Sequence, residues 1–300
     1  MIQLRSPKVR EHFLTALLFI LALLAAILFI LPTVLTISNS FMSEKEITAN
    51  YGAMIESATA DKKTYISEEL NLKFIPDKVS FSQYASVLFK SPDYLLKFWN
   101  SVILVVPITV FQILLAAFTA YGFSRYRGRI REIIFFMYII LMLMPYQVTL
   151  VPNYLVSDWL GILGTRWAII LPGIFSPFSV YLLTKVMRRI PKAYYEAARL
   201  DGASEFQIFW HICLPLTRSA MLSVGLLVFI DYWNMVEQPL ILLKDQDQFP
   251  LSVFLSQINS GDVGLAFAVA VVYMIPALLL FLYGEEYLVE GITYSGGVKG

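Results

Sequence analysis

Charged residues and cysteine are scarce in this 300-residue sequence, and each shortage excludes a class of protein. Only 15% of the residues are charged, against roughly a quarter in an average soluble domain, while 58% are hydrophobic. A single cysteine, Cys213, excludes an internal disulfide framework. The two histidines, His12 and His211, offer no metal cluster, so we expect this chain to bind no metal and no cofactor. A net charge of +1 argues against a nucleic-acid-binding protein.

Long apolar runs dominate the sequence instead, and six of them are long enough to cross a membrane. A helix needs about 20 mostly apolar residues to span about 30 Å of hydrocarbon. The sequence therefore predicts an all-α, polytopic membrane protein. The six predicted transmembrane helices cover residues 13–37, 98–122, 133–156, 167–183, 219–243 and 263–282. The first run is longer than the roughly 7 to 15 apolar residues of a signal peptide, so we expect it to remain as an anchor.

The distribution of lysine and arginine predicts the orientation, because basic residues near short loops resist translocation. Fourteen basic residues fall on the side that holds both termini, the 125–132 loop and the 185–218 loop. The two short loops of the other side contain only Arg166 and Lys244. We therefore expect both termini to be cytoplasmic. In the long outer segment, 38–97, seven lysines are interleaved with eight acidic residues. Within it, the polar stretch 43–72 carries charges of both signs, which favours a solvated loop over a cap that contacts an external partner.

The cytoplasmic loop carries the clearest local signals, which predict two short helices outside the bilayer. Gly202 suits the left-handed position that follows a helix C-terminus. Ser204 and Gln207 have the spacing of a capping box, which predicts a second helix over 205–212 that Pro215 ends. An apolar face on this helix pair is a candidate docking surface. The side chains expected there are Tyr195, Leu200, Phe206, Phe209 and Trp210.

The same loop resembles the EAA motif of membrane subunits of bacterial ABC importers. The motif is formed by Glu196-Ala197-Ala198, Gly202, Ile212 and Leu214-Pro215 at the family's spacing. The chain is similar to the carbohydrate-uptake permeases of the maltose-permease G-subunit type over nearly its whole length. Other matching pieces are Asn100-Ser101, Ala120-Tyr121-Gly122-Phe123-Ser124-Arg125, Met144-Pro145, Trp233-Asn234 and Pro239-Leu240.

This resemblance implies a type I ABC importer permease fold with cytoplasmic coupling helices, in the bacterial cell membrane. It also implies a second homologous permease subunit, two copies of a cytoplasmic ATPase and an extracytoplasmic solute-binding protein. The chain itself would be non-catalytic, with ATP and Mg bound by the ATPase. The sequence agrees, since it contains no G-x-x-x-x-G-K-[ST] phosphate-binding loop.

The resemblance also assigns roles within the loop and divides the chain into segments. Glu196 would be the polar anchor to the ATPase, Ala197 and Ala198 would allow close approach, and Gly202 would form the bend. Arg199 and Asp201 would contact the rim of the groove in the ATPase that receives this helix. The segments are a cytoplasmic N-terminus (1–12), the first helix (13–37), the extracytoplasmic segment (38–97), a permease core with the coupling loop 188–218 (98–290), and a cytoplasmic tail (291–300).

Polar side chains in the fifth predicted helix are candidates for the substrate path, because ionisable groups at membrane depth usually face a cavity or a partner. Positions 231, 234 and 238 share one face of a continuous helix. Asp231 and Asn234 either line a path or hold helices together by hydrogen bonds. The candidate path residues are Asp231, Tyr232, Trp233, Asn234 and Gln238, with Gln147, Thr149 and Asn153 as weaker candidates.

Two other functional classes remain as alternatives to the importer subunit. An intramembrane enzyme would need a nucleophile, base or metal set at membrane depth, and the predicted helices contain Asp231 but no histidine, cysteine or aspartate pair. A self-sufficient channel or secondary transporter would work without an ATPase. Co-purification of an ATP-hydrolysing subunit distinguishes that class from the importer.

Overall fold

The structure is a computed structural model that describes residues 7–59, 73–90, 92–126, 128–257 and 263–296. These residues form helices and no strand, which confirms the all-α prediction for the described part of the chain. The chain divides into two compact units, residues 1–92 with 258–272 and residues 93–257 with 273–300. The predicted segment boundaries within the chain stay predictions.

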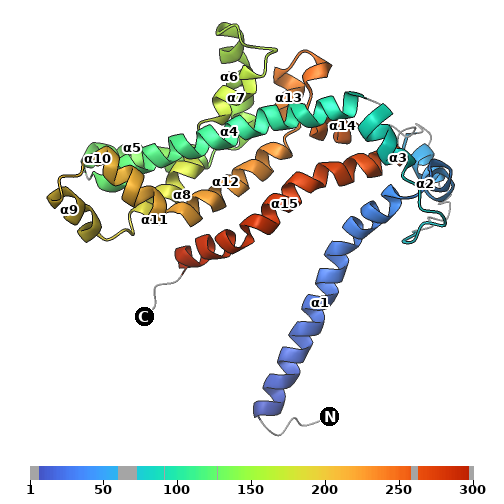
Figure 1. Ribbon diagram of the computed structural model, residues 1–300, viewed down its shortest axis with the longest axis horizontal. Coiled ribbons are helices and arrows are strands. Elements are labelled where there is room, and N and C mark those ends of the chain that lie inside the picture. Colours follow the sequence, from blue (N-terminus) through green and yellow to red (C-terminus); the bar gives the residue numbers. More distant parts are fainter. Residues whose placement is uncertain (1–6, 60–72, 91, 127, 258–262, 297–300) are drawn as a thin grey trace. The chain divides into compact units, whose positions relative to one another are not determined.

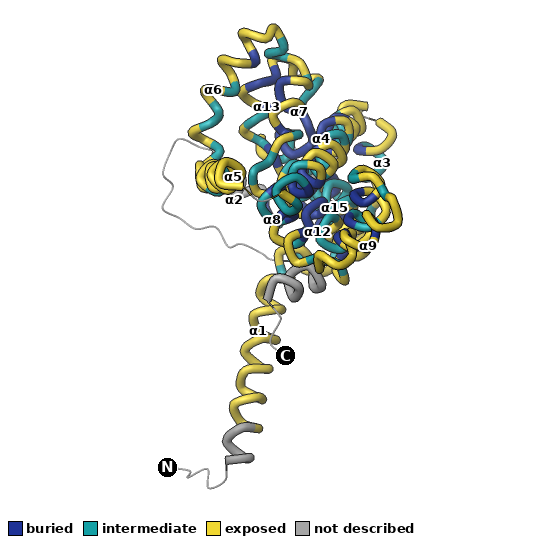
Figure 2. Tube along the Cα trace, turned by 90° about the vertical axis from the view of Figure 1, so that its left-hand side faces the viewer, coloured by how far each residue is buried: buried dark blue, intermediate teal, exposed yellow. Residues whose placement is uncertain are grey.

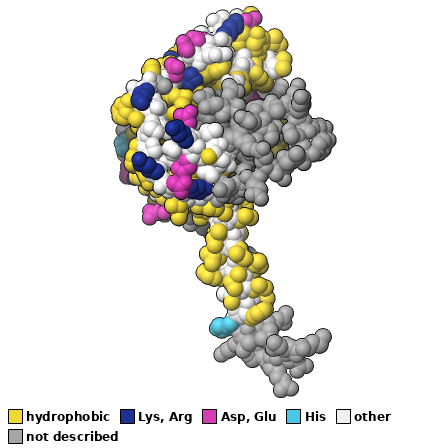
Figure 3. All heavy atoms as spheres, turned by 90° about the vertical axis from the view of Figure 1, so that its right-hand side faces the viewer, with side chains coloured by type: hydrophobic (Ala, Val, Ile, Leu, Met, Phe, Trp, Pro, Cys, Tyr) yellow, Lys and Arg dark blue, Asp and Glu magenta, His cyan; other side chains and the backbone are white. Residues whose placement is uncertain are grey.

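The first unit contains α1 (Pro7–Ser40), α2 (Glu44–Thr59), the short α3 (Ser82–Ala85) and a π-helical turn η1 (Ser86–Lys90). Figure 2 shows that α1 is exposed along nearly its whole length, as expected for an apolar helix that meets lipid. Figure 3 shows apolar side chains covering this helix.

The prediction of a plain solvated loop is wrong for the start of the outer segment, where α2 forms. Ile47 and Tyr51 lie one helical turn apart and are buried together with Met42 in a small apolar cluster, against which Phe267 packs. Asn39 donates a hydrogen bond to the Tyr51 hydroxyl at 2.9 Å. Residues 60–72, further along the outer segment, lie outside the described residues.

The second unit is a helical bundle in which several predicted spans are broken into shorter pieces. Its elements in order are α4 (Pro92–Arg125), α5 (Arg129–Met142), α6 (Tyr146–Trp159), α7 (Trp167–Gly173), α8 (Pro177–Met187), α9 (Lys192–Leu200), α10 (Glu205–Ile208), the π-helical turn η2 (Phe209–Cys213), α11 (Leu214–Leu216), α12 (Arg218–Trp233), α13 (Glu237–Leu242), the 3-10 turn η3 (Gln246–Gln248), α14 (Leu251–Ser256) and α15 (Val263–Gly296), whose first ten residues belong to the first unit.

Four of the described helices are long and apolar enough to cross a membrane alone, and the number rises to six if each of two bent pairs counts as one span. The predicted helix over 133–156 is one of the bent pairs, because α5 and α6 meet at 102°. Pro145 lies at this break and favours it: its backbone is extended, it has no N–H, and it disfavours helical geometry at the residue before it.

The predicted helix over 219–243 is also interrupted, at Asn234–Val236 between α12 and α13. The Tyr273 hydroxyl donates at the start of this break, at 2.7 Å from the carbonyl oxygen of Trp233 and 2.8 Å from Oδ1 of Asn234. Positions 231, 234 and 238 therefore do not share the face of one continuous helix, and that prediction is wrong.

Two apolar clusters hold the second unit together. One joins α4, α8, α9, η2 and α12 through small, aliphatic and aromatic side chains such as Ala117, Leu183 and Phe209. The other joins α4, α7, α12 and α13 around Trp233, which is 1% exposed and stacks on Phe229 and Tyr273. Figure 1 shows α9, α10 and α11 gathered beside the end of α4 that carries Arg125. The first cluster thus connects the coupling loop to the bundle.

Candidate functional site

The turn after α9 has the geometry that the sequence predicts. Gly202 has a φ of +82°, in the left-handed region that glycine adopts without a steric penalty. Its N–H donates to the carbonyl of Arg199 at 3.0 Å, and the N–H of Ala203 donates to the carbonyl of Ala198 at 2.9 Å. This pair of bonds is the Schellman arrangement, which closes the C-terminus of a helix.

The second short helix begins as predicted and ends later than predicted. The Ser204 hydroxyl accepts from the N–H of Gln207 at 3.3 Å, and Gln207 Oε1 accepts from the N–H of Ser204 at 2.8 Å, so the capping box is confirmed. The helical path then continues through η2 and α11 to Leu216, so Pro215 does not end it. Pro215 lies in the first turn of α11, where a missing N–H is tolerated.

The helix pair buries one face against its own membrane helices and leaves another uncovered. Tyr195 and Phe209 are buried, and Phe209 stacks on Phe118 with ring centroids 4.6 Å apart. Leu200 and Phe206, by contrast, are 89% and 63% exposed. The predicted apolar set therefore splits in two: Tyr195 and Phe209 anchor the loop, while Leu200, Phe206 and Trp210 form its exposed apolar face.

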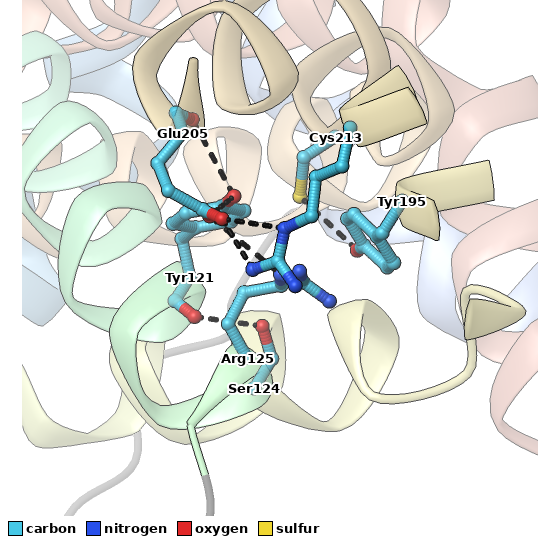
Figure 4. Close-up of polar contacts among 7 residues, drawn as sticks. Tyr121, Ser124, Arg125, Tyr195, Glu205 and Cys213 are labelled. Carbon is cyan, nitrogen blue, oxygen red and sulfur yellow. Dashed lines mark hydrogen bonds and ion pairs between the residues drawn. The ribbon is translucent and has the colours of Figure 1, made fainter. Parts of the chain in front are cut away.

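Glu205, the first residue of α10, connects three parts of the chain. Its Oε2 accepts a hydrogen bond from the Tyr121 hydroxyl of α4 at 2.7 Å, and its Oε1 accepts from Nε of Arg199 in α9 at 2.9 Å. Nε of Arg125 lies 3.9 Å from Oε2. Figure 4 shows Tyr121 and Arg125 of α4 converging on Glu205 of the coupling loop. Glu205 therefore joins α9 and α10 to each other and to α4.

The electrostatics of this cluster keep Glu205 ionised. Partial burial raises the pKa of its carboxyl group, but hydrogen bonds from Tyr121 and Arg199 and the charge of Arg125 outweigh burial and leave the pKa below its ordinary value. The Arg125 guanidinium also lies over the ring of Tyr195, 3.9 Å from the ring centroid, in a cation–π contact. Arg125 thus contacts both short helices, through Glu205 and Tyr195.

The predicted coupling residues occupy distinct places in this arrangement. Glu196, Ala197, Asp201 and Gly202 are exposed, while Ala198 is buried in the cluster behind them. Arg199, in the last turn of α9, is paired with Glu205. Glu196 borders a groove of about 460 Å³ whose other lining residues include the basic side chains Arg125, Arg188, Lys192 and Arg199. The loop therefore presents both a charged groove and an apolar face.

A second candidate region lies where α5–α6 and α12–α13 are broken. A cavity of about 640 Å³ is lined there by Tyr146, Thr149, Asn153, Asp231 and other side chains. An adjoining cavity of about 560 Å³ shares Tyr146, Asp231, Tyr232 and Gln238 with it. Both breaks expose their polar side chains to these two cavities, which we call the Asp231 cavities.

The structure brings four of the five leading path candidates to the Asp231 cavities. Asp231, Tyr232 and Gln238 line both, and Asn234 lines the second. Asn234 also bonds to the Ile230 carbonyl at 2.8 Å and to Tyr273, so it serves helix packing as well. Trp233 lines neither cavity; it is buried and donates from Nε1 to the Tyr273 carbonyl at 3.1 Å. Of the weaker candidates, Thr149 and Asn153 line the larger cavity and Gln147 lines the second.

The chain can be compared with known proteins at this point. Residues 112–292, more than half of the sequence, match the family described as the binding-protein-dependent transport system inner membrane component. The chain belongs to this family. The matched range includes the coupling loop and the Asp231 cavities, so both candidate regions lie in the part that members of the family share.

Two curated relatives illustrate the family. The arabinooligosaccharides transport system permease protein AraQ of Bacillus subtilis is 30% identical over 77% of this chain and 83% of its own length. The diacetylchitobiose uptake system permease protein NgcG of Streptomyces coelicolor is 30% identical over 73% of this chain and 74% of its own length. The chain is thus a carbohydrate ABC permease by family.

A solved structure supports the fold. A chain from the crystal structure of a bacterial ABC transporter involved in the import of the acidic polysaccharide alginate superposes with a TM-score of 0.74 and 23% identity, and the match covers 96% of this chain and 99% of that one. The likeness confirms the ABC importer permease fold, which the sequence predicts from its motif.

Glu205 and Arg125 are the important residues of the site that reasoning from the sequence missed. Glu205 looks like an ordinary acidic residue in the first turn of a helix, where acidic residues are common. Its partner Tyr121 is 84 residues away, so no local spacing reveals the contact. Among the described residues, no group of three or more His, Cys, Asp or Glu side chains is placed to hold a metal ion.

Proposed function

We propose that this chain is the transmembrane permease subunit of an ATP-driven importer for an oligosaccharide. The observation that carries the proposal is the coupling loop, which sets the EAA spacing on an exposed helix pair in a sequence without a phosphate-binding loop. The names of the family relatives, which are permeases for oligosaccharides and related sugars, support a carbohydrate as the cargo.

The loop would dock on a cytoplasmic ABC ATPase, two copies of which would bind ATP and Mg and supply the energy. Glu196 would be the polar anchor, since it is exposed beside the basic groove. Leu200, Phe206 and Trp210 would be covered by the ATPase, because an exposed apolar face of this kind is typical of a binding surface. Gly202 would hold the angle between the helices.

A second, homologous permease subunit would complete the path that the Asp231 cavities begin. Asp231, Tyr232, Asn234 and Gln238 would line that path, and Trp233 would support it from the core. An extracytoplasmic solute-binding protein would deliver the sugar from the other side. Both termini would be cytoplasmic, following the bias of basic residues.

The test is to express this chain with its genomic neighbours, purify the complex and measure ATP hydrolysis and sugar uptake in proteoliposomes. We expect an ATP-hydrolysing subunit to co-purify with the wild-type chain. Glu196→Lys should leave the chain in the membrane but lower ATP-dependent uptake at least tenfold, because the anchor would meet the ATPase with the opposite charge.

The matched control is Glu285→Lys, which makes the same charge change at another exposed glutamate, on α15. Uptake by this variant should stay close to wild type. Unchanged uptake in Glu196→Lys contradicts the role of the anchor, and uptake that proceeds without any ATPase subunit contradicts the importer in favour of a channel or secondary transporter.

A further inference from the structure

We infer that the Asp231 cavities accept uncharged saccharides and reject saccharides that carry carboxylates, such as oligouronates. This inference rests on the proposed function, since it assigns the substrate class of the proposed path. It is based on the aromatic, polar and acidic side chains that line the cavities, and on the lack of lysine and arginine among the described residues that line them.

The larger cavity has the size and composition of a sugar site. Its volume of about 640 Å³ lies within the range of about 300 to 1,000 Å³ that is usual for small-molecule sites. Tyr146, Tyr232, Phe175 and Phe178 supply aromatic surface, which suits the apolar faces of a sugar ring. The polar lining includes Thr149, Asn153, Ser176 and Gln238, which can bond to sugar hydroxyls.

One buried polar group in the wall is available to a ligand. The Tyr146 hydroxyl is buried beside the Gln238 side chain and makes no hydrogen bond of ordinary geometry among the described residues. Buried polar groups normally have partners, because an unsatisfied one costs free energy. A hydroxyl group of a bound sugar, or a water molecule that the sugar displaces, can satisfy Tyr146.

The charged lining is acidic only. Asp231 lines both cavities and Glu237 lines the second, while no lysine or arginine is among the described residues that line either. The two basic residues of the short outer loops are positioned elsewhere. Arg166 donates to Oδ1 of Asn100 at 2.7 Å, and the side chain of Lys244 packs beside Gly164. A ligand carboxylate would therefore face acidic groups without a neutralising cation.

This charge pattern discriminates between the two classes of sugar. An uncharged sugar hydroxyl can donate to Asp231, as carboxylates readily accept such bonds. The N-termini of α6 and α8, which border the larger cavity, contribute partial positive charges of about half a unit each, and the two full carboxylate charges of Asp231 and Glu237 outweigh them. A ligand carboxylate held about 7 Å from Asp231 at an effective dielectric constant of about 20 is disfavoured on the order of tenfold to a hundredfold.

The experiment compares uptake of matched sugars by the complete transporter in proteoliposomes, with the solute-binding protein saturated by each sugar in turn. The sugars are an oligogalacturonide and its methyl-esterified, uncharged counterpart, together with neutral hexose and pentose oligosaccharides. We expect the wild type to take up uncharged sugars and to reject the oligogalacturonide. Asp231→Asn should raise the ratio of charged to uncharged uptake about tenfold, and Asp158→Asn, an exposed aspartate that lines neither cavity, should leave this ratio unchanged.

Two results would overturn the inference. If the wild-type transporter prefers the oligogalacturonide to its esterified form, the cavities do not reject carboxylates. If neither Asp231→Asn nor Asp158→Asn changes the ratio of charged to uncharged uptake, Asp231 does not determine that ratio. In both cases ATP-driven uptake persists, so the proposed function stands. Absence of ATP-dependent uptake for every sugar would instead overturn the proposed function and, with it, this inference.

Discussion

Replacing Glu205 by glutamine should loosen the coupling loop from the membrane helices while keeping its shape. Glutamine retains an oxygen that can accept from Tyr121, but it loses the negative charge that strengthens this bond. The loop should then leave its docked position more often, and ATP hydrolysis should drive transport less efficiently. The prediction tests whether Glu205, rather than the exposed Glu196, fixes the loop to the bundle.

The magnitude follows from the bond between Tyr121 and Glu205. Hydrogen bonds to charged groups contribute about 1.5 to 3 kcal/mol and neutral ones about 0.5 to 1.5 kcal/mol. The Glu205 side chain is 38% exposed, so the lower part of these ranges applies. Removing the charge should cost about 1 kcal/mol, which increases the population of the undocked loop roughly fivefold. The half-exposed Arg199 is screened by water and adds little to this figure.

Hydrogen exchange on the full-length chain in lipid nanodiscs measures this population directly. Amides of α9 and α10 should exchange roughly fivefold faster in Glu205→Gln, while amides of α12 keep their wild-type rates. Glu196→Gln is the control, since it removes the same charge from an exposed side chain. Tyr121→Phe should have a similar effect, and the double variant should be no worse than either single variant. Additive effects of the two changes, or unchanged exchange in Glu205→Gln, would refute the reasoning.

Three further predictions concern stability. Because the pKa of Glu205 in the folded protein lies below its ordinary value, the stability that its charge gives the loop is complete above about pH 4.5 and is lost as the pH falls through the lowered pKa. Amide hydrogen exchange in the loop should therefore accelerate at low pH in the wild type but not in Glu205→Gln. Gly202→Ala should destabilise the loop by about 1 to 2 kcal/mol, because alanine disfavours the positive φ at this position. Gly122→Ala, inside helix α4, should not destabilise it, and the rate at which a protease cleaves the loop measures the difference. Trp233→Ala should cost about 3 to 5 kcal/mol and lower the thermal midpoint.

The parts of the fold that the sequence predicts correctly depend on neighbouring residues. Gly202, Ser204 and Gln207 lie within six positions, and their bonds form inside one turn. Long apolar runs likewise identify helices, because lipid requires every backbone group to be paired within its own segment. The family motif also indicates the function of the loop, and it can be found in the sequence because its residues lie close together along the chain.

The parts that the sequence does not predict depend on tertiary contacts. Prolines in the apolar runs show this well, because Pro107 and Pro276 lie inside the uninterrupted helices α4 and α15, whereas Pro145 stands at a 102° break. A proline permits a break, but packing on both sides decides whether one forms. The contact of Glu205 with Tyr121 is equally invisible in the sequence, as 84 residues separate the two.

The two helix breaks have a consequence for hydration. The first turns of α6 and α13 contain N–H groups that no preceding helical turn can satisfy, and both begin at the Asp231 cavities. Such backbone is tolerated at membrane depth only where protein covers it or water reaches it. Because both first turns open onto the Asp231 cavities, water in these cavities can satisfy their N–H groups. A sugar that enters would then replace water on hydrogen-bonding groups that are already in position.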